Sequence, residues 1–214
     1  MFNDTAIARF RGPWGIPIEI GATLPLLAFI ILSAGGTPGP TTLTFIAVIV
    51  VSILLHELGH AWGCIVQGVP VERVMLYGGG GFCQPARAPS HREDELIVAM
   101  GPIVDIVLWA LSSLALNYVQ GGMVAVVLWQ VMVVNLALFA LNMLPVQPLD
   151  GGKLLHLLLR RFFPPLFALK ITGFVGLIFS ILWIPGLVMV WFYLGFLIFF
   201  MPNIALHWAM FRAK

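Results

Sequence analysis

His56-Glu57-Leu58-Gly59-His60 lies inside an apolar segment that runs from Thr42 to Val66. The two histidines are four residues apart, and this spacing places them on one face of a helix. Both imidazoles can then reach one Zn²⁺, and the glutamate between them can act as a general base. Because ionisable side chains are costly inside a membrane span, their presence there predicts a functional site.

The composition around this motif is that of a membrane protein. Of the 214 residues, 60% are hydrophobic and 9% are charged, whereas a soluble domain carries about 25% charged residues. We therefore expect one transmembrane domain over residues 1–214, with no room for a sizeable soluble domain. Residues 1–20 lack the cleavage site of a signal peptide, and the two cysteines are too few for a disulfide framework. The sequence shows no phosphate loop and no basic groove, so nothing in it indicates nucleic-acid binding.

Hydropathy predicts the membrane spans, each of which needs about 20 predominantly apolar residues. Six helices are expected, at about 18–34, 42–66, 96–117, 122–146, 166–184 and 186–206. The last two meet at Pro185-Gly186, and an alternative interpretation merges them or shortens them into a re-entrant pair. The expected fold class is an all-α polytopic membrane protein with about six transmembrane helices and a small glycine-rich, membrane-associated β segment.

The basic residues predict the orientation of these spans. Every lysine and arginine falls on one side of the six-helix arrangement: Arg9, Arg11, Arg73, Arg87, Arg92, Lys153, Arg160, Arg161, Lys170, Arg212 and Lys214. By the positive-inside rule, both termini are expected in the cytoplasm, in a multi-pass protein of the cell membrane. His60 would then lie about 10 Å below the cytoplasmic surface.

A zinc ion held by two histidines needs a further protein ligand and an open position for water. Asp150 is the best candidate, because the span that precedes it is expected to end on the same side as His60. Pro145 and Pro148 interrupt helical hydrogen bonding there, and such backbone at membrane depth lines a cavity or is buried in protein. An Asp-Gly-Gly sequence alone is typical of an ordinary turn, but the matching depth of the histidine pair favours a ligand.

These motifs together resemble the site-2 protease family of intramembrane zinc metalloproteases. The resemblance is carried by His56-Glu57-x-x-His60 on an early span and by the later segment Asn142…Pro145…Leu149-Asp150-Gly151-Gly152, with Gly15-Ile16-Pro17-Ile18, Gly101-Pro102 and Gly78–Gly81 also similar. It implies one Zn²⁺ per chain, held by His56, His60 and Asp150. It also implies that Glu57 is the catalytic base, that Asn142 assists catalysis, and that the Gly78–Gly81 run belongs to a strand that pairs with substrate.

The implied activity is that of a zinc metalloendopeptidase. It would hydrolyse peptide bonds in or near transmembrane segments of membrane-spanning or membrane-associated proteins, within the lipid bilayer. The alternative is a non-proteolytic zinc-binding membrane protein, either a transporter or a pseudoprotease. Glu57 argues against a transport site, which needs no base between its ligands. The expected form is minimal, without the PDZ or nucleotide-sensing domains that some family members carry.

Three further polar residues lie in or near the expected spans. Asp105 stands where many relatives have an uncharged amide. It is either a partner that orients a ligating histidine or an acid that faces water or is hydrogen-bonded for another reason, and both interpretations stay open. Asn135 is expected to form an interhelical hydrogen bond. His207 is expected at a solvent-exposed or interfacial position.

Overall fold

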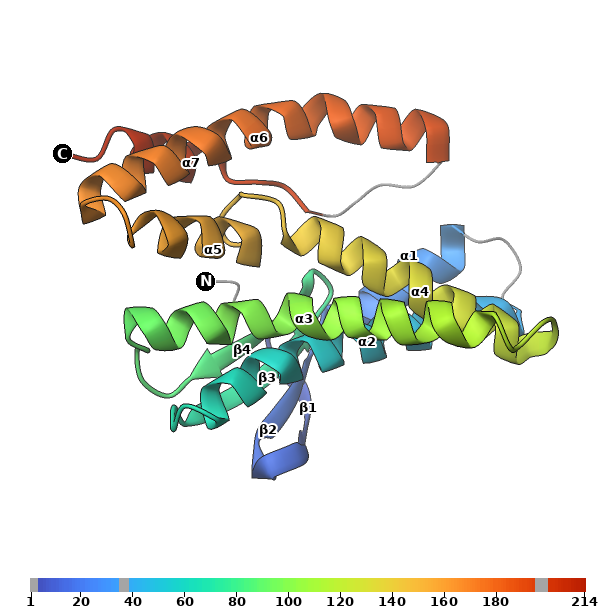
Figure 1. Cartoon of the computed structure of the whole chain (residues 1–214). Coiled ribbons are helices and arrows are strands. Elements are labelled where there is room, and N and C mark those ends of the chain that lie inside the picture. Colours follow the sequence, from blue (N-terminus) through green and yellow to red (C-terminus); the bar gives the residue numbers. More distant parts are fainter. Residues whose placement is uncertain (1–3, 35–38, 195–199) are drawn as a thin grey trace. The chain divides into compact units, whose positions relative to one another are not determined.

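The computed structural model describes residues 4–34, 39–194 and 200–214 (Figure 1). The chain divides into two compact units, unit 1 at Met1–Phe139 and unit 2 at Ala140–Lys214. The single transmembrane domain expected over residues 1–214 stays a prediction.

Unit 1 contains a four-stranded sheet. Strands β1 (Ala6–Arg11), β2 (Pro17–Gly21), β3 (Val71–Tyr77) and β4 (Gly80–Pro85) lie in the order β1-β2-β3-β4. Strands β1 and β2 are antiparallel, β2 and β3 are parallel, and β3 and β4 are antiparallel. The glycine run thus forms the β3–β4 turn and the start of β4, which confirms a β segment there and makes β4 an edge strand.

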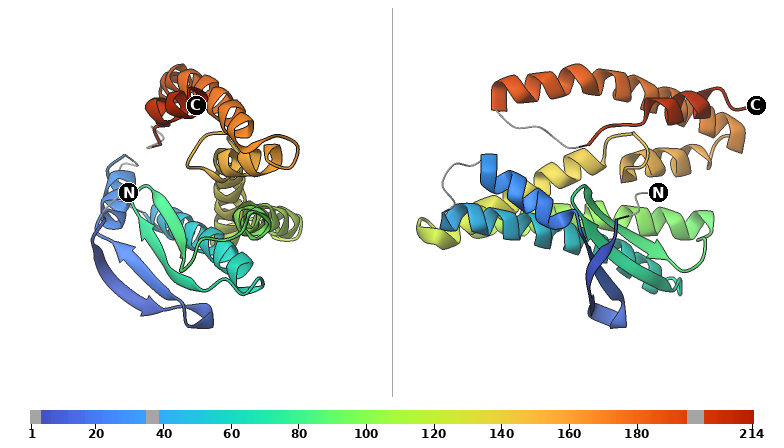
Figure 2. Two further views of the ribbon diagram at one scale, coloured as in Figure 1. Left: turned by 90° about the vertical axis from the view of Figure 1, so that its left-hand side faces the viewer. Right: turned by 180° about the vertical axis from the view of Figure 1, so that it is seen from behind.

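The sheet packs on helix α2 (Pro40–Ile65), which lies alongside it in Figure 2. Ile18 of β2 pairs with Val74 of β3, and both side chains are buried together with Ala61 of α2. Alternating residues of a strand point to opposite faces, so Ile18 enters this core while its neighbour Glu19 points away. The contact fixes the sheet against the helix that carries both histidines.

The prediction of a first span over 18–34 is wrong. Residues 17–21 form β2, and the following helix α1, Leu24–Ala34, has only 11 residues. At 1.5 Å per residue such a helix is about 16 Å long, roughly half the hydrocarbon thickness of a bilayer. Glu19 favours the strand, because its carboxylate accepts hydrogen bonds from the guanidinium groups of Arg9 on β1 and Arg73 on β3.

Helices α2, α3 (His91–Leu116) and α4 (Gly122–Asn142) complete unit 1, α4 up to Phe139. A capping box at Ser90 and Glu93 starts α3. Glycine lets α2 approach α3 closely, because a Cβ on Gly59 would lie 2.7 Å from the Met100 carbonyl oxygen. Asn135 Nδ2 of α4 donates to Ser52 Oγ of α2 at 3.0 Å, which confirms its predicted interhelical hydrogen bond.

Unit 2 contains helices α5 (Asp150–Leu159), α6 (Pro165–Leu194) and α7 (Ile204–Phe211). The prediction of two spans separated at Pro185-Gly186 is wrong, because α6 continues through both residues. Proline is tolerated inside apolar helices where neighbouring groups satisfy the freed backbone. Residues 195–199, part of the expected last span, lie outside the described residues.

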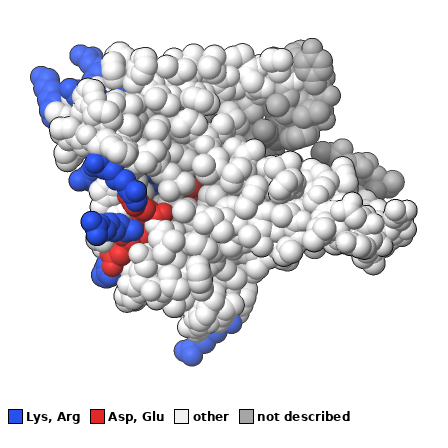
Figure 3. All heavy atoms as spheres, viewed as in Figure 1, with Lys and Arg blue, Asp and Glu red and all other residues white. Residues whose placement is uncertain are grey.

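Four helices in the described part of the chain are long and apolar enough to cross a membrane: Pro40–Ile65, His91–Leu116, Gly122–Asn142 and Pro165–Met189. The chain is therefore a multi-pass membrane protein of mainly helical fold, and a set of six spans is not confirmed. On the face of unit 1 drawn in Figure 3, the basic side chains gather near the start of α3 and at the β1–β2 hairpin, and the α3 surface beyond them is uncharged.

Candidate metal centre

The two motif histidines face each other from successive turns of α2. Their Nε2 atoms are 3.1 Å apart and the ring planes meet at 86°. Both side chains are buried, with relative exposures of 4% for His56 and 8% for His60. The i, i+4 spacing predicted from the sequence therefore brings the two imidazole nitrogens to one point.

Hydrogen bonds from α3 determine how the two rings are oriented. His60 Nδ1 lies 2.7 Å from the Ile97 carbonyl oxygen, and His56 Nδ1 lies 2.8 Å from Asp105 Oδ2. Since a carbonyl or a carboxylate oxygen can only accept a hydrogen bond, each Nδ1 carries the hydrogen. Each Nε2 is then left with a lone pair that can bind a metal ion. Asp105 is completely buried, which excludes a water-facing position, and its carboxylate orients the ring of His56.

The geometry of the nitrogen pair fits zinc. Two Nε2 lone pairs at 3.1 Å repel each other unless a positive charge lies between them. Two nitrogen ligands at about 2.05 Å from a tetrahedral Zn²⁺ lie roughly 3.3 Å from each other. A histidine whose second nitrogen donates to a carboxylate or a backbone carbonyl is the usual form of a zinc-bound imidazole.

Because Gly101 of α3 has no side chain, the space beside the two imidazole rings stays open. A Cβ at this position would lie 2.5 Å from His60 Nε2 and 2.7 Å from His56 Cε1. Any side chain larger than hydrogen would therefore collide with both imidazole rings. Gly101 of the Gly101-Pro102 pair therefore has a steric reason to be glycine in this structure.

Glu57 lies between the histidines in sequence and is also buried, at 6% exposure. It packs against β4, because a Cβ on Gly81 would lie 2.6 Å from Glu57 Cγ. Burial, and after it the nearby Glu57 carboxylate, raises the pKa of Tyr77 on β3. A buried carboxylate beside a metal-binding pair, with an edge strand against it, can act as a general base.

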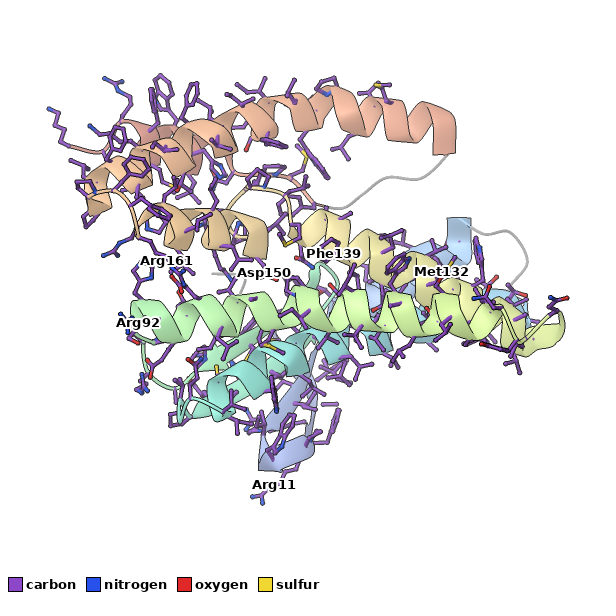
Figure 4. All side chains as sticks on the ribbon, in the orientation of Figure 1. Arg11, Arg92, Met132, Phe139, Asp150 and Arg161 are labelled. Carbon is purple, nitrogen blue, oxygen red and sulfur yellow. The ribbon has the colours of Figure 1, made fainter. Side chains whose placement is uncertain are left out.

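Asp150 and Asn142 belong to unit 2. Asp150 is the first residue of α5 (Figure 4) and is buried, with Lys153 Nζ 3.8 Å from its Oδ1. Asn142 is the last residue of α4 and is half-buried. The Gly151-Gly152 pair lets α5 start directly against the preceding loop, since a Cβ on Gly152 would lie 2.5 Å from the Val146 carbonyl carbon. The role of Asp150 as a zinc ligand and that of Asn142 in catalysis stay predictions.

The interpretation of His207 as a solvent-exposed or interfacial residue is wrong. The side chain is completely buried in unit 2, and its Nε2 accepts a hydrogen bond from the Gln147 backbone N–H at 3.0 Å. Its partner lies 60 residues earlier in the chain. No local pattern in the sequence could have indicated this contact.

A protein-family model also matches the part of the chain that carries the histidine pair. The family model for peptidase family M50 matches residues 44–122 and 111–183. The chain belongs to peptidase family M50. The matched region of this M50 chain includes both histidines, Glu57 and Asp150.

Named relatives of the M50 chain are metalloproteases and a sporulation protein. It is 27% identical over 164 residues to a zinc metalloprotease of Methanocaldococcus jannaschii, covering 76% of this chain and 48% of that protein. It is 30% identical over 118 residues to stage IV sporulation protein FB of Bacillus subtilis, covering 52% of this chain and 39% of that protein. The M50 chain thus spans about half, or less, of the length of these relatives.

The fold of the M50 chain is also found in a solved structure. The site-2 protease from Methanocaldococcus jannaschii matches with a TM-score of 0.65 and 24% sequence identity, covering 88% of this chain and 85% of that one. At this identity the match shows the fold, which is that of a site-2 protease.

Proposed function

We propose that this chain is an intramembrane zinc endopeptidase that hydrolyses peptide bonds in or near the transmembrane segments of membrane-spanning or membrane-associated proteins. The observation that carries the proposal is the His56–His60 pair, whose Nε2 atoms lie 3.1 Å apart on an apolar helix. Glu57 between them supplies the base that a hydrolase needs and a transporter does not. In this proposal both units form one metalloprotease domain.

The proposed zinc ligands are His56, His60 and Asp150, with one ion per chain. Asp150 is buried, as both histidines are, and its carboxylate can bind a metal ion as their imidazoles can. Two imidazoles and one carboxylate leave a fourth position open, which is the ligand set of a catalytic zinc site. When bound, zinc supplies Lewis-acid chemistry that acidifies water and polarises the scissile carbonyl.

Glu57 is the proposed general base. It takes the proton of the attacking water and later passes it to the leaving amine. Its burial removes competing solvent from the carboxylate. Asn142 is the proposed hydrogen-bond donor to the oxyanion or to the substrate backbone, a role for which a side-chain amide is suited.

Strand β4 is the proposed binding edge for substrate. It is the last strand of the sheet, and it carries Gly81 against Glu57. An edge strand offers backbone N–H and C=O groups to an extended peptide. A substrate helix that unwinds locally could pair with β4 and thereby bring its scissile bond beside the general base.

The proposed location is the cell membrane, with both termini in the cytoplasm. The basic residues of unit 1 lie near the start of α3 and on the strands, and the loop 117–121 at the other end of α3 has none. This distribution is the one that the positive-inside rule associates with a cytoplasmic start of α3.

Incubation of the purified protein with a panel of helical membrane substrates tests the proposed activity. Cleavage is expected with zinc bound, and it should stop after a chelator removes the metal and return when zinc is restored. A protein that binds one zinc ion but cleaves no member of the panel would instead support the non-proteolytic alternative. Cleavage that persists in the metal-free protein would contradict the proposed mechanism.

A further inference from the structure

His207 lies on α7 and is enclosed by unit 2. Its ring faces α6 at Gly176, where an added Cβ would coincide with the imidazole. Gly173, one turn earlier, allows the same close approach, because a Cβ there would lie 2.5 Å from the Phe211 backbone nitrogen. The ring therefore occupies a space that two helical glycines leave open.

Both ring nitrogens of His207 have hydrogen-bond partners. Nδ1 lies 2.8 Å from the Asn203 carbonyl oxygen, which can only accept, so Nδ1 carries the hydrogen. Nε2 consequently presents a lone pair, and the Gln147 backbone N–H donates to it at 3.0 Å. Ser180 Oγ lies 3.4 Å from Nδ1 and adds a second contact on that side. This arrangement selects one tautomer and one ring orientation.

The Gln147 amide belongs to the loop that leads to the proposed ligand Asp150. Pro145 and Pro148 in this loop have no N–H group to donate. Backbone bonds close the loop from Val146 N–H to the Leu144 carbonyl at 2.7 Å and from Leu149 N–H to the Val146 carbonyl at 2.9 Å. The Gln147 N–H is instead bound by a side chain from the other end of unit 2.

We propose that His207 is a positioning residue of the metal centre, which holds the Pro145–Leu149 loop so that α5 starts with Asp150 in its ligating position. The inference rests on the proposed function, in which Asp150 is a zinc ligand. Ligand positions must be held to within a few tenths of an ångström, and a loop interrupted by prolines needs an external anchor to achieve this. His207 lies outside the residues that match the family model.

Two substitutions at His207 separate an acceptor role from simple packing. His207→Gln keeps an acceptor at about the place of Nε2, whereas His207→Leu fills the space without one. Loss of a partner that orients a metal site typically weakens metal affinity by about 10–100-fold. We expect His207→Leu to bind zinc about ten-fold more weakly than wild type, measured by competition with a chelator, and His207→Gln to lie within about three-fold of wild type.

Thr172→Val is the matched control. Thr172 is also completely buried in unit 2 and donates to the Ala168 carbonyl at 2.8 Å. Its Oγ1 lies 3.3 Å from His156 Nδ1 on α5, so the control removes a buried contact of α5 that does not involve the Pro145–Leu149 loop. Its loss should lower the unfolding temperature without changing zinc affinity. If His207→Leu, like this control, lowers the unfolding temperature but leaves zinc affinity unchanged, the positioning role is overturned.

An experiment on the unmodified protein covers the case in which His207→Leu does not fold. Amide hydrogen exchange of the segment 143–150 should be slow at Gln147, and fast exchange there would overturn the inference. Asp150→Ala separates the two proposals. If it loses zinc while His207→Leu binds normally, the ligand assignment stands and the positioning role fails. If Asp150→Ala keeps full zinc affinity, the ligand assignment itself fails.

Discussion

Gly101→Ala tests the histidine pair directly, because it adds one methyl group against both imidazole rings. The new Cβ would lie 2.5 Å from both Nε2 and Cε1 of His60 and 2.7 Å from His56 Cε1. Non-bonded carbon atoms normally stay about 3.5–4.0 Å apart, so the overlap amounts to roughly 1 Å. The rings must move by about this distance, or the methyl group must occupy the place of the ion.

A displacement of this size exceeds what a zinc site tolerates, since ligand distances stay within about 0.2 Å of their usual values. We expect Gly101→Ala to lower zinc affinity at least about 100-fold, the upper end of the range for losing a partner that orients a ligand. The fold should persist, because alanine is favoured over glycine inside a helix by about 1 kcal/mol.

The assay is competition for zinc between the protein and a chelator of known affinity, together with thermal unfolding. Gly186→Ala on α6 is the control, because among the described residues no atom outside its chain neighbours and the nearby backbone of its own helix lies within 4 Å of the added Cβ. It should leave zinc affinity unchanged. Zinc binding by Gly101→Ala with wild-type affinity would refute the assignment of the metal to the space in front of the two Nε2 atoms.

Three further predictions follow from other parts of unit 1. Asp105→Leu should weaken zinc binding about 10–100-fold, whereas Asp105→Asn, which keeps an acceptor for His56, should bind nearly as wild type; equal affinities would exclude an orienting role. Glu19 is buried, which alone would raise its pKa, but its hydrogen bonds to Arg9 and Arg73 outweigh burial and lower the pKa from 4.5. Its pairing should therefore stabilise the sheet above pH 4.5 and be lost as the pH falls through the lower folded-state pKa. The unfolding difference between wild type and Glu19→Gln, on the order of 1–2 kcal/mol near neutral pH, should then shrink in acid, and a difference independent of pH would contradict this. For the orientation, a membrane-impermeant thiol reagent added outside cells should label Tyr118→Cys but not Arg87→Cys in a protein without its native cysteines, and the reverse pattern would overturn the proposed topology.

The histidine pair could be predicted from the sequence because helix geometry alone places both residues on one face. Residues four apart lie on one helix face, whereas the Nε2–Nε2 distance of 3.1 Å also depends on the ring orientations that the hydrogen bonds to α3 determine. The role of Asp105 was harder to predict, since hydropathy gives the depth of a residue in a span but not the direction in which its side chain points. Its contact with His56 depends on which face of α3 is turned toward α2.

Two span predictions failed for physical reasons that can be named. A short apolar run such as residues 16–20 suits a strand as well as a helix, and the ion pairs of Glu19 with Arg9 and Arg73 come from tertiary structure. Pro185 predicts a break only if the freed backbone group has no other way to be accommodated. His207 could not be predicted at all, because its acceptor role depends on Gln147, 60 residues away.

The most direct test of the central claim compares zinc-loaded wild type with zinc-loaded Glu57→Gln on a membrane-spanning substrate in liposomes. Glu57 is a base and not a ligand in this account, so the variant should keep one zinc ion per chain. Loss of a general base should slow cleavage by about 10²–10⁴-fold. Cleavage by Glu57→Gln at a rate near that of wild type, with zinc still bound, would contradict the claim that this chain is a zinc protease of the proposed mechanism.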